Sequence, residues 1–411
     1  MAVPRQGEAY SVQTHEQLID LAWKGSIVPL LQDRFPGITE AQLQEAHAYA
    51  YGGCAVQDLG YYPFGKPFFS DLTHYVRPAD FVLALVRDAK TPDELAFAVG
   101  AFSHYVGDIR GHAVAVNPSV GTEFPKLQEK YGRVVTYEDN PHAHVRTEFA
   151  FDINEVSKHR FAPSRYLSHV GLKVSMDLLK KAFEETYGIK LEEVLRTPKP
   201  RSLPNYEFAV RRFLPNIAYA ETLLHRHSMP ADTPGPDLDQ LERELAQSEQ
   251  DNGWDAYRKK AGIGTYSLAG LIFVLPKVGP LQMLAIKGPT AQTEDLYVKS
   301  VNLSIDLLRT QLAGMRTEWA ADHKVLVNRD LDTGARVMPG TYRLTDQTYA
   351  KLVGELTKNP AATVPSGLRD DVLAYYSDPT APISTKKKTE QWAKLQTELE
   401  MLRAMPTVAQ R

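Results

Sequence analysis

Residues 103–112 read S-H-Y-V-G-D-I-R-G-H and place His104, Asp108 and His112 at successive i, i+4 steps. On an α-helix, residues four apart share a face, so these three side chains would lie one above another. Imidazole and carboxylate groups are ligands that zinc prefers. This stretch therefore predicts a helix that carries metal ligands.

A second i, i+4 pair, His144 and Glu148, follows in H-V-R-T-E. One such pair is weak evidence, because polar pairs at this spacing are common on solvated helix faces. Two of them, with further His and Asp residues upstream, predict a metal cluster, in which the oxygens of Asp108 could bridge two ions. The candidate ligands in chain order are His15, Asp58, His74, His104, Asp108, His112, His144 and Glu148.

The composition is that of a globular protein with room for two domains or one large domain. The chain has 411 residues, of which 43% are hydrophobic and 24% charged. A net charge of -3 argues against a strongly basic nucleic-acid surface. The single cysteine, Cys54, excludes an internal disulfide and a zinc site built from cysteines. No apolar run is long enough to predict a transmembrane helix.

Hydrophobic spacing predicts an all-α first domain, residues 10–228, with Thr14 as the N-cap of its first helix and a loop-rich stretch at 58–78. A Pro- and Asp-rich linker is predicted at 229–237, followed by a mostly helical region, 238–411. Helices are expected at 14–33, 39–57, 78–90, 91–116, 140–158, 163–187 and 205–228, then at 237–250, 291–326, 346–358 and 385–404, with an apolar segment at 266–286 and turns at 328–346.

The order His, Asp, His, HxxxD, His, HxxxE on an all-α domain resembles the zinc-dependent phospholipase C family, which shares its architecture with fungal single-strand-specific nucleases. The resemblance covers about residues 10–225 and is closest to the bacterial branch of the family. It rests on T-H-E-Q-L-I-D-L-A-W (14–23), Y-G-G-C-A-V-Q-D-L-G-Y-Y-P (51–63), F-F-S-D-L-T-H-Y (68–75) and F-S-H-Y-V-G-D (102–108).

The resemblance implies a centre of two or three zinc ions, in which Asp108 bridges two of them. The implied sets are Asp58, His74, His104 and Asp108 for one ion; His112, His144 and Glu148 for a second; and His15 with Asp108 for a third. In the family, the α-amine and carbonyl of an N-terminal Trp complete the third site. Tyr10 stands at that position here, behind residues 1–9. The three-residue gap between Asp108 and His112 is also tighter than in better-known members.

The first nine residues, M-A-V-P-R-Q-G-E-A, lack the apolar core of a signal peptide. They can be a disordered arm or the remnant of a signal peptide. Removal of residues 1–9 would free the amine of Tyr10 and imply a secreted or periplasmic protein; otherwise the protein is expected in the cytoplasm.

We expect a phosphodiester hydrolase that cleaves phospholipid headgroups with a metal-activated water, with Asp58 as the candidate general base. No organic cofactor is needed. Phospholipase D-like cleavage, a zinc nuclease, and a non-catalytic zinc-stabilised module that binds a membrane or a protein remain as alternatives. No specific nucleic acid is expected as a partner.

Two apolar features bear on a peripheral membrane contact. The aromatic residues between Asp58 and His74 could wall a cleft, bind a quaternary ammonium group or a nucleobase, or pack the loop. They are Tyr61, Tyr62, Phe64, Phe68 and Phe69. The segment 266–286 could dip into a lipid interface, but Pro276 and Pro280 interrupt it, and a buried hairpin is the favoured interpretation.

Overall fold

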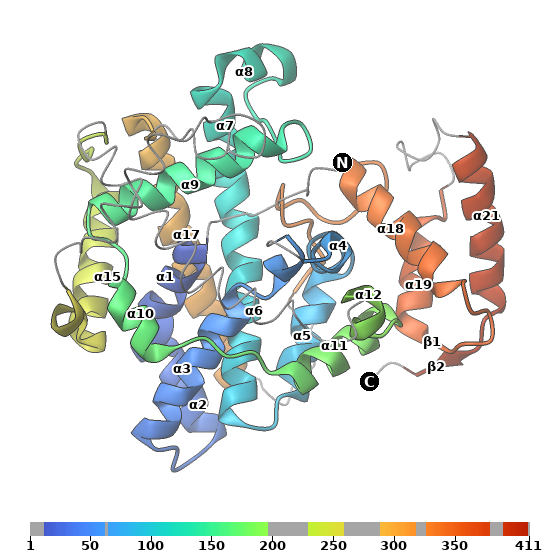
Figure 1. Ribbon diagram of the computed structural model, residues 1–411, viewed down its shortest axis with the longest axis horizontal. Helices are drawn as coiled ribbons and strands as arrows, with labels where there is room; N and C mark the ends of the chain where they lie inside the picture. Colours follow the sequence, from blue (N-terminus) through green and yellow to red (C-terminus); the bar gives the residue numbers. More distant parts are fainter. Residues whose placement is uncertain are drawn as a thin grey trace.

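The computed structural model describes residues 12–61, 65–195, 229–258, 288–317, 326–378 and 389–409. It shows a mainly α-helical protein with α6 (Pro92–Gly111) near its centre and α15 (Pro236–Asn252) and α21 (Thr389–Ala404) toward opposite ends of the long axis (Figure 1). The mainly α fold expected from the sequence is confirmed. Among the described helices, none has the length and apolarity that crossing a membrane requires.

Helices of the first half surround α6, and most of them lie where hydrophobic spacing predicts. Thr39 and Thr91 form capping boxes with Gln42 and Glu94, which start α3 and α6. The elements are α1 (Val12–Ala22), α2 (Val28–Arg34), α3 (Glu40–Cys54), η2 (Gln57–Gly60), α4 (Pro67–Tyr75), α5 (Pro78–Asp88), α6, α7 (Asn117–Glu123), α8 (Pro125–Tyr131), α9 (Pro141–Ser157), α10 (Ser164–Val170), α11 (Met176–Tyr187) and α12 (Leu191–Leu195).

Three local expectations are wrong. The stretch 58–78 contains two helices, η2 and α4, where a loop was expected; Pro67 is tolerated in the first turn of α4, whose buried apolar side chains face the core. The helix expected at 163–187 is two helices, separated at Gly171, which has φ +86°. Thr14 lies inside α1 and caps nothing: its hydroxyl donates to Asp152 Oδ1 at 2.9 Å.

The helices expected at 14–33 and 91–116 both contain a π-helical turn. These turns are η1 (Trp23–Ile27), between α1 and α2, and η3 (His112–Val116), between α6 and α7. A π-turn inserts an extra residue into the helix and is frequent at functional sites. In η3 the turn begins at His112, a candidate ligand.

Close contact between α3 and α6 forms the centre of the core. A Cβ atom on Gly53 would lie 2.0 Å from the carbonyl oxygen of Phe97, and one on Gly100 would lie 2.2 Å from that of Ala50. Glycine at both positions therefore lets the two backbones touch. This contact sets the distance between Cys54, at the end of α3, and His104 on α6.

Elements from the second half also pack on the first. α17 (Ala291–Thr317) packs against α1, α6 and α15, and α18 (Arg343–Leu356) packs against α4. The remaining elements are η5 (Trp254–Tyr257), α19 (Ser366–Tyr375), α21 and a two-residue parallel pairing of β1 (Val364–Pro365) with β2 (Thr407–Val408). The helix expected at 205–228 and the apolar segment 266–286 lie outside the described residues.

Candidate metal centre

All eight candidate ligands within the described residues are buried. They come from five parts of the chain: His15 from α1, Asp58 from η2, His74 from the end of α4, the pair of His144 and Glu148 from α9, and the remaining three from α6 and its continuation, namely His104, Asp108 and His112. Tyr10, the candidate main-chain ligand, lies outside the described residues.

Asp108 stands among three imidazole rings. Its Oδ1 lies 3.2 Å from Nε2 of His15, and its Oδ2 lies 3.1 Å from Nε2 of His104 and 3.5 Å from Nε2 of His74. Asp58 Oδ1 lies 3.2 Å from Nε2 of His74. Two groups of donor atoms result, each within 4.8 Å: one of Asp58, His74 and His104, the other of His15, His104 and Asp108.

His112, His144 and Glu148 form a third group of the same size. Glu148 Oε1 lies 2.8 Å from His144 Nε2 and 3.5 Å from His112 Nε2, and the two Nε2 atoms lie 3.3 Å apart. His112 therefore lies beside its expected neighbours, despite the short three-residue gap between Asp108 and His112.

Helix geometry explains why one helix serves all three groups. Each four-residue step turns about 400° and rises about 6 Å, so each side chain is offset by about 40° from the one before. His104 and His112 thus lie about 12 Å apart along the axis, one on each side of Asp108. The π-turn at His112 then leads the chain away from the ideal helical path.

Backbone carbonyls orient three of the imidazoles. Nδ1 of His74 donates to Ser70 O at 2.8 Å, and Nδ1 of His104 donates to Cys54 O at the same distance. Nδ1 of His112 donates to Leu331 O at 2.7 Å. Because a carbonyl can only accept, each neutral ring carries its proton on Nδ1 and presents the lone pair of Nε2 to the cluster.

Electrostatics favour the metal-binding form of Asp108 and of His144, and the protonated form of His74. Although burial works the other way, the neighbouring imidazoles hold the pKa of Asp108 well below its usual range. Burial, together with His112, lowers the pKa of His144 well below its ordinary value. For His74, burial is outweighed by the nearby carboxylates of Asp108 and Asp58, and its pKa rises to about 10, so a metal ion would displace a proton from this ring. The carboxylate of Asp108 is thus ionised and the ring of His144 neutral.

The buried polar atoms of the cluster fit zinc. Within the described part of the chain, neither oxygen of Asp58 nor either oxygen of Asp108 accepts a hydrogen bond, and both side chains are fully buried. Burial of a carboxylate without such compensation costs several kcal/mol. A cation would supply the missing interaction, and imidazole Nε2 with carboxylate oxygen is a donor set that zinc prefers.

Sequence reasoning missed the contribution of residues 328–334 (N-R-D-L-D-T-G). Leu331 O accepts from His112, and Leu331 N donates to His74 O at 3.1 Å. Asp332 Oδ1 lies 3.7 Å from His112 Nδ1, and Asp332 Oδ2 accepts from the hydroxyls of Tyr75 and Tyr342. Leu331 is 219 residues from His112, so no spacing rule could have indicated this contact.

The described aromatic residues near the centre differ in position. Tyr61 lies beside His74, with ring centroids 5.4 Å apart, so it borders the cluster. Phe69 stacks on Phe183 in the core, which supports a packing role. Tyr62 and Phe64 lie outside the described residues.

Comparison with known proteins agrees with this donor set. Residues 14–196 match the model of the family described as zinc dependent phospholipase C. No curated protein and no solved structure matches the chain significantly. The matched segment contains all eight candidate ligands within the described residues. Residues 14–196 are therefore similar to the zinc-dependent phospholipase C family.

Proposed function

We propose that the buried cluster is the active centre of a zinc-dependent phosphodiesterase that hydrolyses phospholipids as a phospholipase C does. The observation that carries the proposal is Asp108, a fully buried carboxylate that faces His15, His74 and His104. The match of residues 14–196 to the model of the zinc-dependent phospholipase C family supports the same reaction. A phospholipid substrate also implies peripheral contact with a membrane.

The three groups of donor atoms would hold two or three zinc ions, one ion to a group. Asp108 would contribute an oxygen to each of two groups, and Tyr10 would complete the group of His15 after removal of residues 1–9 during export. When bound, zinc polarises the phosphate oxygens and makes water acidic enough to be a nucleophile near neutral pH. N-terminal sequencing of the native protein tests the role of Tyr10.

Asp58 is the residue that we propose as the general base. Its Oδ1 faces His74 at 3.2 Å and His104 at 3.9 Å, while within the described residues Oδ2 has no hydrogen-bond donor. Oδ2 could therefore accept the proton of the attacking water. A general base of this kind typically contributes about 10²–10⁴-fold in rate.

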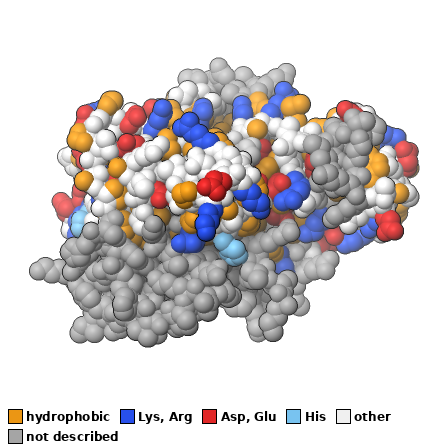
Figure 2. Space-filling model, turned by 90° about the horizontal axis from the view of Figure 1, so that it is seen from above, with side chains coloured by type: hydrophobic (Ala, Val, Ile, Leu, Met, Phe, Trp, Pro, Cys, Tyr) orange, Lys and Arg blue, Asp and Glu red, His pale blue; other side chains and the backbone are white. Residues whose placement is uncertain are grey.

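The zinc nuclease is the second candidate function, because related architectures carry both activities. The net charge of -3 disfavours it. On the face seen in Figure 2, the Lys and Arg side chains of the described residues are interspersed with Asp and Glu. Phospholipase D-like cleavage would use the same donor atoms, and a non-catalytic zinc module would hold zinc without turnover.

Turnover assays with the zinc-loaded full-length protein distinguish these functions. We expect EDTA-sensitive hydrolysis of phosphatidylcholine to diacylglycerol and phosphocholine, with slower hydrolysis of a chromogenic phosphodiester. Phosphatidic acid as the product would indicate D-type cleavage, and degradation of single-stranded DNA would indicate a nuclease. If zinc is fully loaded and none of these substrates is hydrolysed, the catalytic proposal is wrong.

A further inference from the structure

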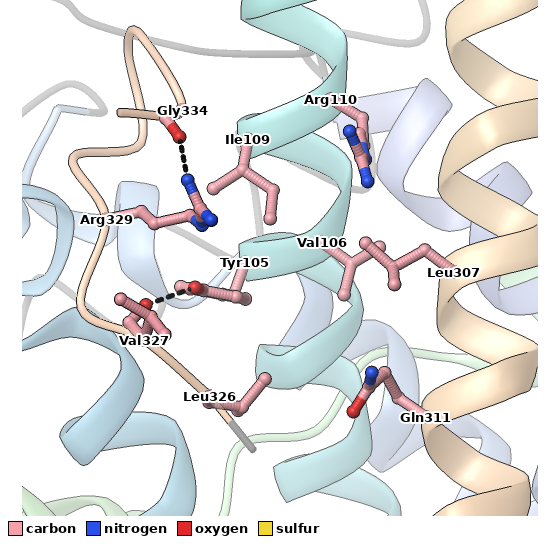
Figure 3. A pocket seen from close by; sticks show the side chains of 10 residues that line it. All are labelled: Tyr105, Val106, Ile109, Arg110, Leu307, Gln311, Leu326, Val327, Arg329 and Gly334. Atoms are coloured by element: carbon pink, nitrogen blue, oxygen red, sulfur yellow. Dashed lines mark hydrogen bonds between the residues drawn. The ribbon is translucent and has the colours of Figure 1, made fainter. Parts of the chain in front are cut away.

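A second site lies on a different face of α6, where Tyr105, Val106, Ile109 and Arg110 line a pocket of about 230 Å³. Val106 and Arg110 are rotated by roughly 120° or more around the helix from the positions of His104, Asp108 and His112, while Tyr105 and Ile109 lie between the two faces. α17 forms one wall of the pocket, and the chain from Leu326 to Gly334 forms the opposite wall (Figure 3).

The lower part of the pocket is mainly apolar. Val106 on α6, Leu307 on α17 and Leu326 on the opposite wall supply aliphatic side chains (Figure 3). Gln311, at the edge of this region, adds one amide group. Such a surface fits a short hydrocarbon segment better than a fully polar ligand.

Two guanidinium groups lie at the upper part of the pocket. Arg110 extends from α6 and Arg329 from the opposite wall, with Ile109 between them (Figure 3). Arg329 Nη1 donates to Gly334 O at 2.8 Å, which orients its guanidinium and leaves further N–H groups for a ligand. No described carboxylate forms an ion pair with Arg110, and the same holds for Arg329. Guanidinium groups of this kind bind phosphate or carboxylate oxygens.

We propose that this pocket binds a small anionic amphiphile: a phosphate or carboxylate head on a short hydrocarbon chain. The arginines would bind the head, and the aliphatic side chains would pack against the chain. The volume of about 230 Å³ is below the range typical of drug-sized ligands, about 300–1,000 Å³, so a complete two-chain phospholipid does not fit. The site is therefore distinct from the proposed substrate site.

Isothermal titration of the zinc-loaded full-length protein tests the proposal, with hexyl phosphate, hexanoate, inorganic phosphate and 1-hexanol as probes. We expect at least one of the two amphiphilic anions to bind more tightly than inorganic phosphate and 1-hexanol. Arg110→Gln should weaken that binding by about tenfold or more, because it removes charge-assisted hydrogen bonds. The better anion identifies the preferred head group.

Arg133→Gln is the matched control, since Arg133 is exposed and lies outside the pocket. It should bind the probes as the wild type does, and melting temperatures should show that both variants fold. Equal binding by Arg110→Gln and wild type would overturn the proposal. It would show that the measured heat of binding comes from another site, such as the metal centre. Binding of 1-hexanol as tight as that of both anions would also overturn it.

Discussion

At the scale of single residues, Asp108 and Asp58 set the chemistry of the centre. Each is fully buried, and an imidazole Nε2 atom lies within 3.2 Å of an oxygen of each. Nδ1 of His74 and Nδ1 of His104 each donate to a backbone carbonyl. The Nε2 lone pair of each neutral ring therefore points toward the carboxylates. This arrangement is stable only when a cation or protons occupy it.

Asp58→Asn should reduce kcat by about 100-fold or more while KM changes little, because the amide keeps the shape of the side chain but cannot take a proton. Initial rates on phosphatidylcholine, at zinc contents matched by elemental analysis, measure this. A loss of kcat/KM that comes only from a higher KM, with kcat unchanged, would contradict the role of Asp58 as a base.

His144→Ala should lower the zinc content by about one ion per chain, because it removes a donor from a group of three. His142→Ala is the matched control on the same helix, since His142 is exposed and outside every donor group. Elemental analysis of both purified variants gives the answer. Loss of zinc from both variants, or from neither, would show that His112, His144 and Glu148 do not form a zinc site.

Glu155, which is buried away from the candidate ligands, makes stability depend on pH. Burial raises its pKa from 4.5 to about 7, although Arg160 opposes the shift. Below pH 4.5 the carboxyl is protonated in both the folded and the unfolded chain. As the pH rises from about 4.5 to about 7, only the unfolded chain loses the proton readily, so the folded state loses stability, by up to about 3 kcal/mol.

Glu155→Gln should therefore be more stable than the wild type at pH 8 and equally stable near pH 4.5. The amide oxygen can still accept from Arg160 Nη1, which lies 3.4 Å from Glu155 Oε1. Denaturant titrations at the two pH values measure the difference in free energy of unfolding. A difference that does not change with pH would show that Glu155 has the same pKa in the folded and the unfolded chain.

At the scale of elements, the contact between α3 and α6 couples packing to the centre. Gly53 and Gly100 allow the backbones to touch, and the carbonyl of Cys54 at the end of α3 then accepts from His104 Nδ1. An added side chain between the helices would separate the carbonyl from the imidazole. The orientation of a candidate ligand thus depends on two glycines.

Gly100→Ala should destabilise the fold by about 1–3 kcal/mol or more, because its Cβ would lie 2.2 Å from Ala50 O and 2.7 Å from Cys54 N. Gly314→Ala is the control: it lies in α17, its Cβ meets nothing within 4 Å, and we expect a gain of about 0.5–1 kcal/mol. Thermal unfolding of both variants tests the pair, and a gain in both would contradict the close contact.

At the scale of the whole molecule, the second half supports the centre in the first. Leu331 contacts both His74 and His112, and Asp332 accepts from Tyr75 of the first half and Tyr342 of the second. Asn117 Nδ2 also donates to Asp332 O at 2.7 Å. Residues 328–334 therefore hold the end of α4 and the start of η3 in place.

Asp332→Ala should destabilise the protein by about 1–3 kcal/mol for each tyrosine hydroxyl left without its acceptor, and weaken zinc binding by about 10–100-fold. Asp332→Asn retains one acceptor oxygen and should have the smaller effect. Chemical denaturation and competition with a zinc chelator measure the two quantities. Unchanged zinc affinity in Asp332→Ala would show that the centre does not depend on this loop.

The sequence by itself determined the mainly α fold, most helix positions and the order of the candidate ligands, because these depend on local spacing along the chain. His104, Asp108 and His112 are neighbours on one helix, so their relation could be predicted. Helix breaks were less predictable: Gly171 divides one expected helix, and α4 forms where turn residues suggested a loop.

Only the tertiary structure decided which ligands meet and what surrounds them. Distances such as that between Asp58 and His74, and the bonds of Leu331 and Asp332, join segments that no local pattern relates. The same is true of the pocket between Arg110 and Arg329. The physical reason is that these contacts arise from the packing of helices against one another, which depends on the whole core and not on the propensity of any one segment.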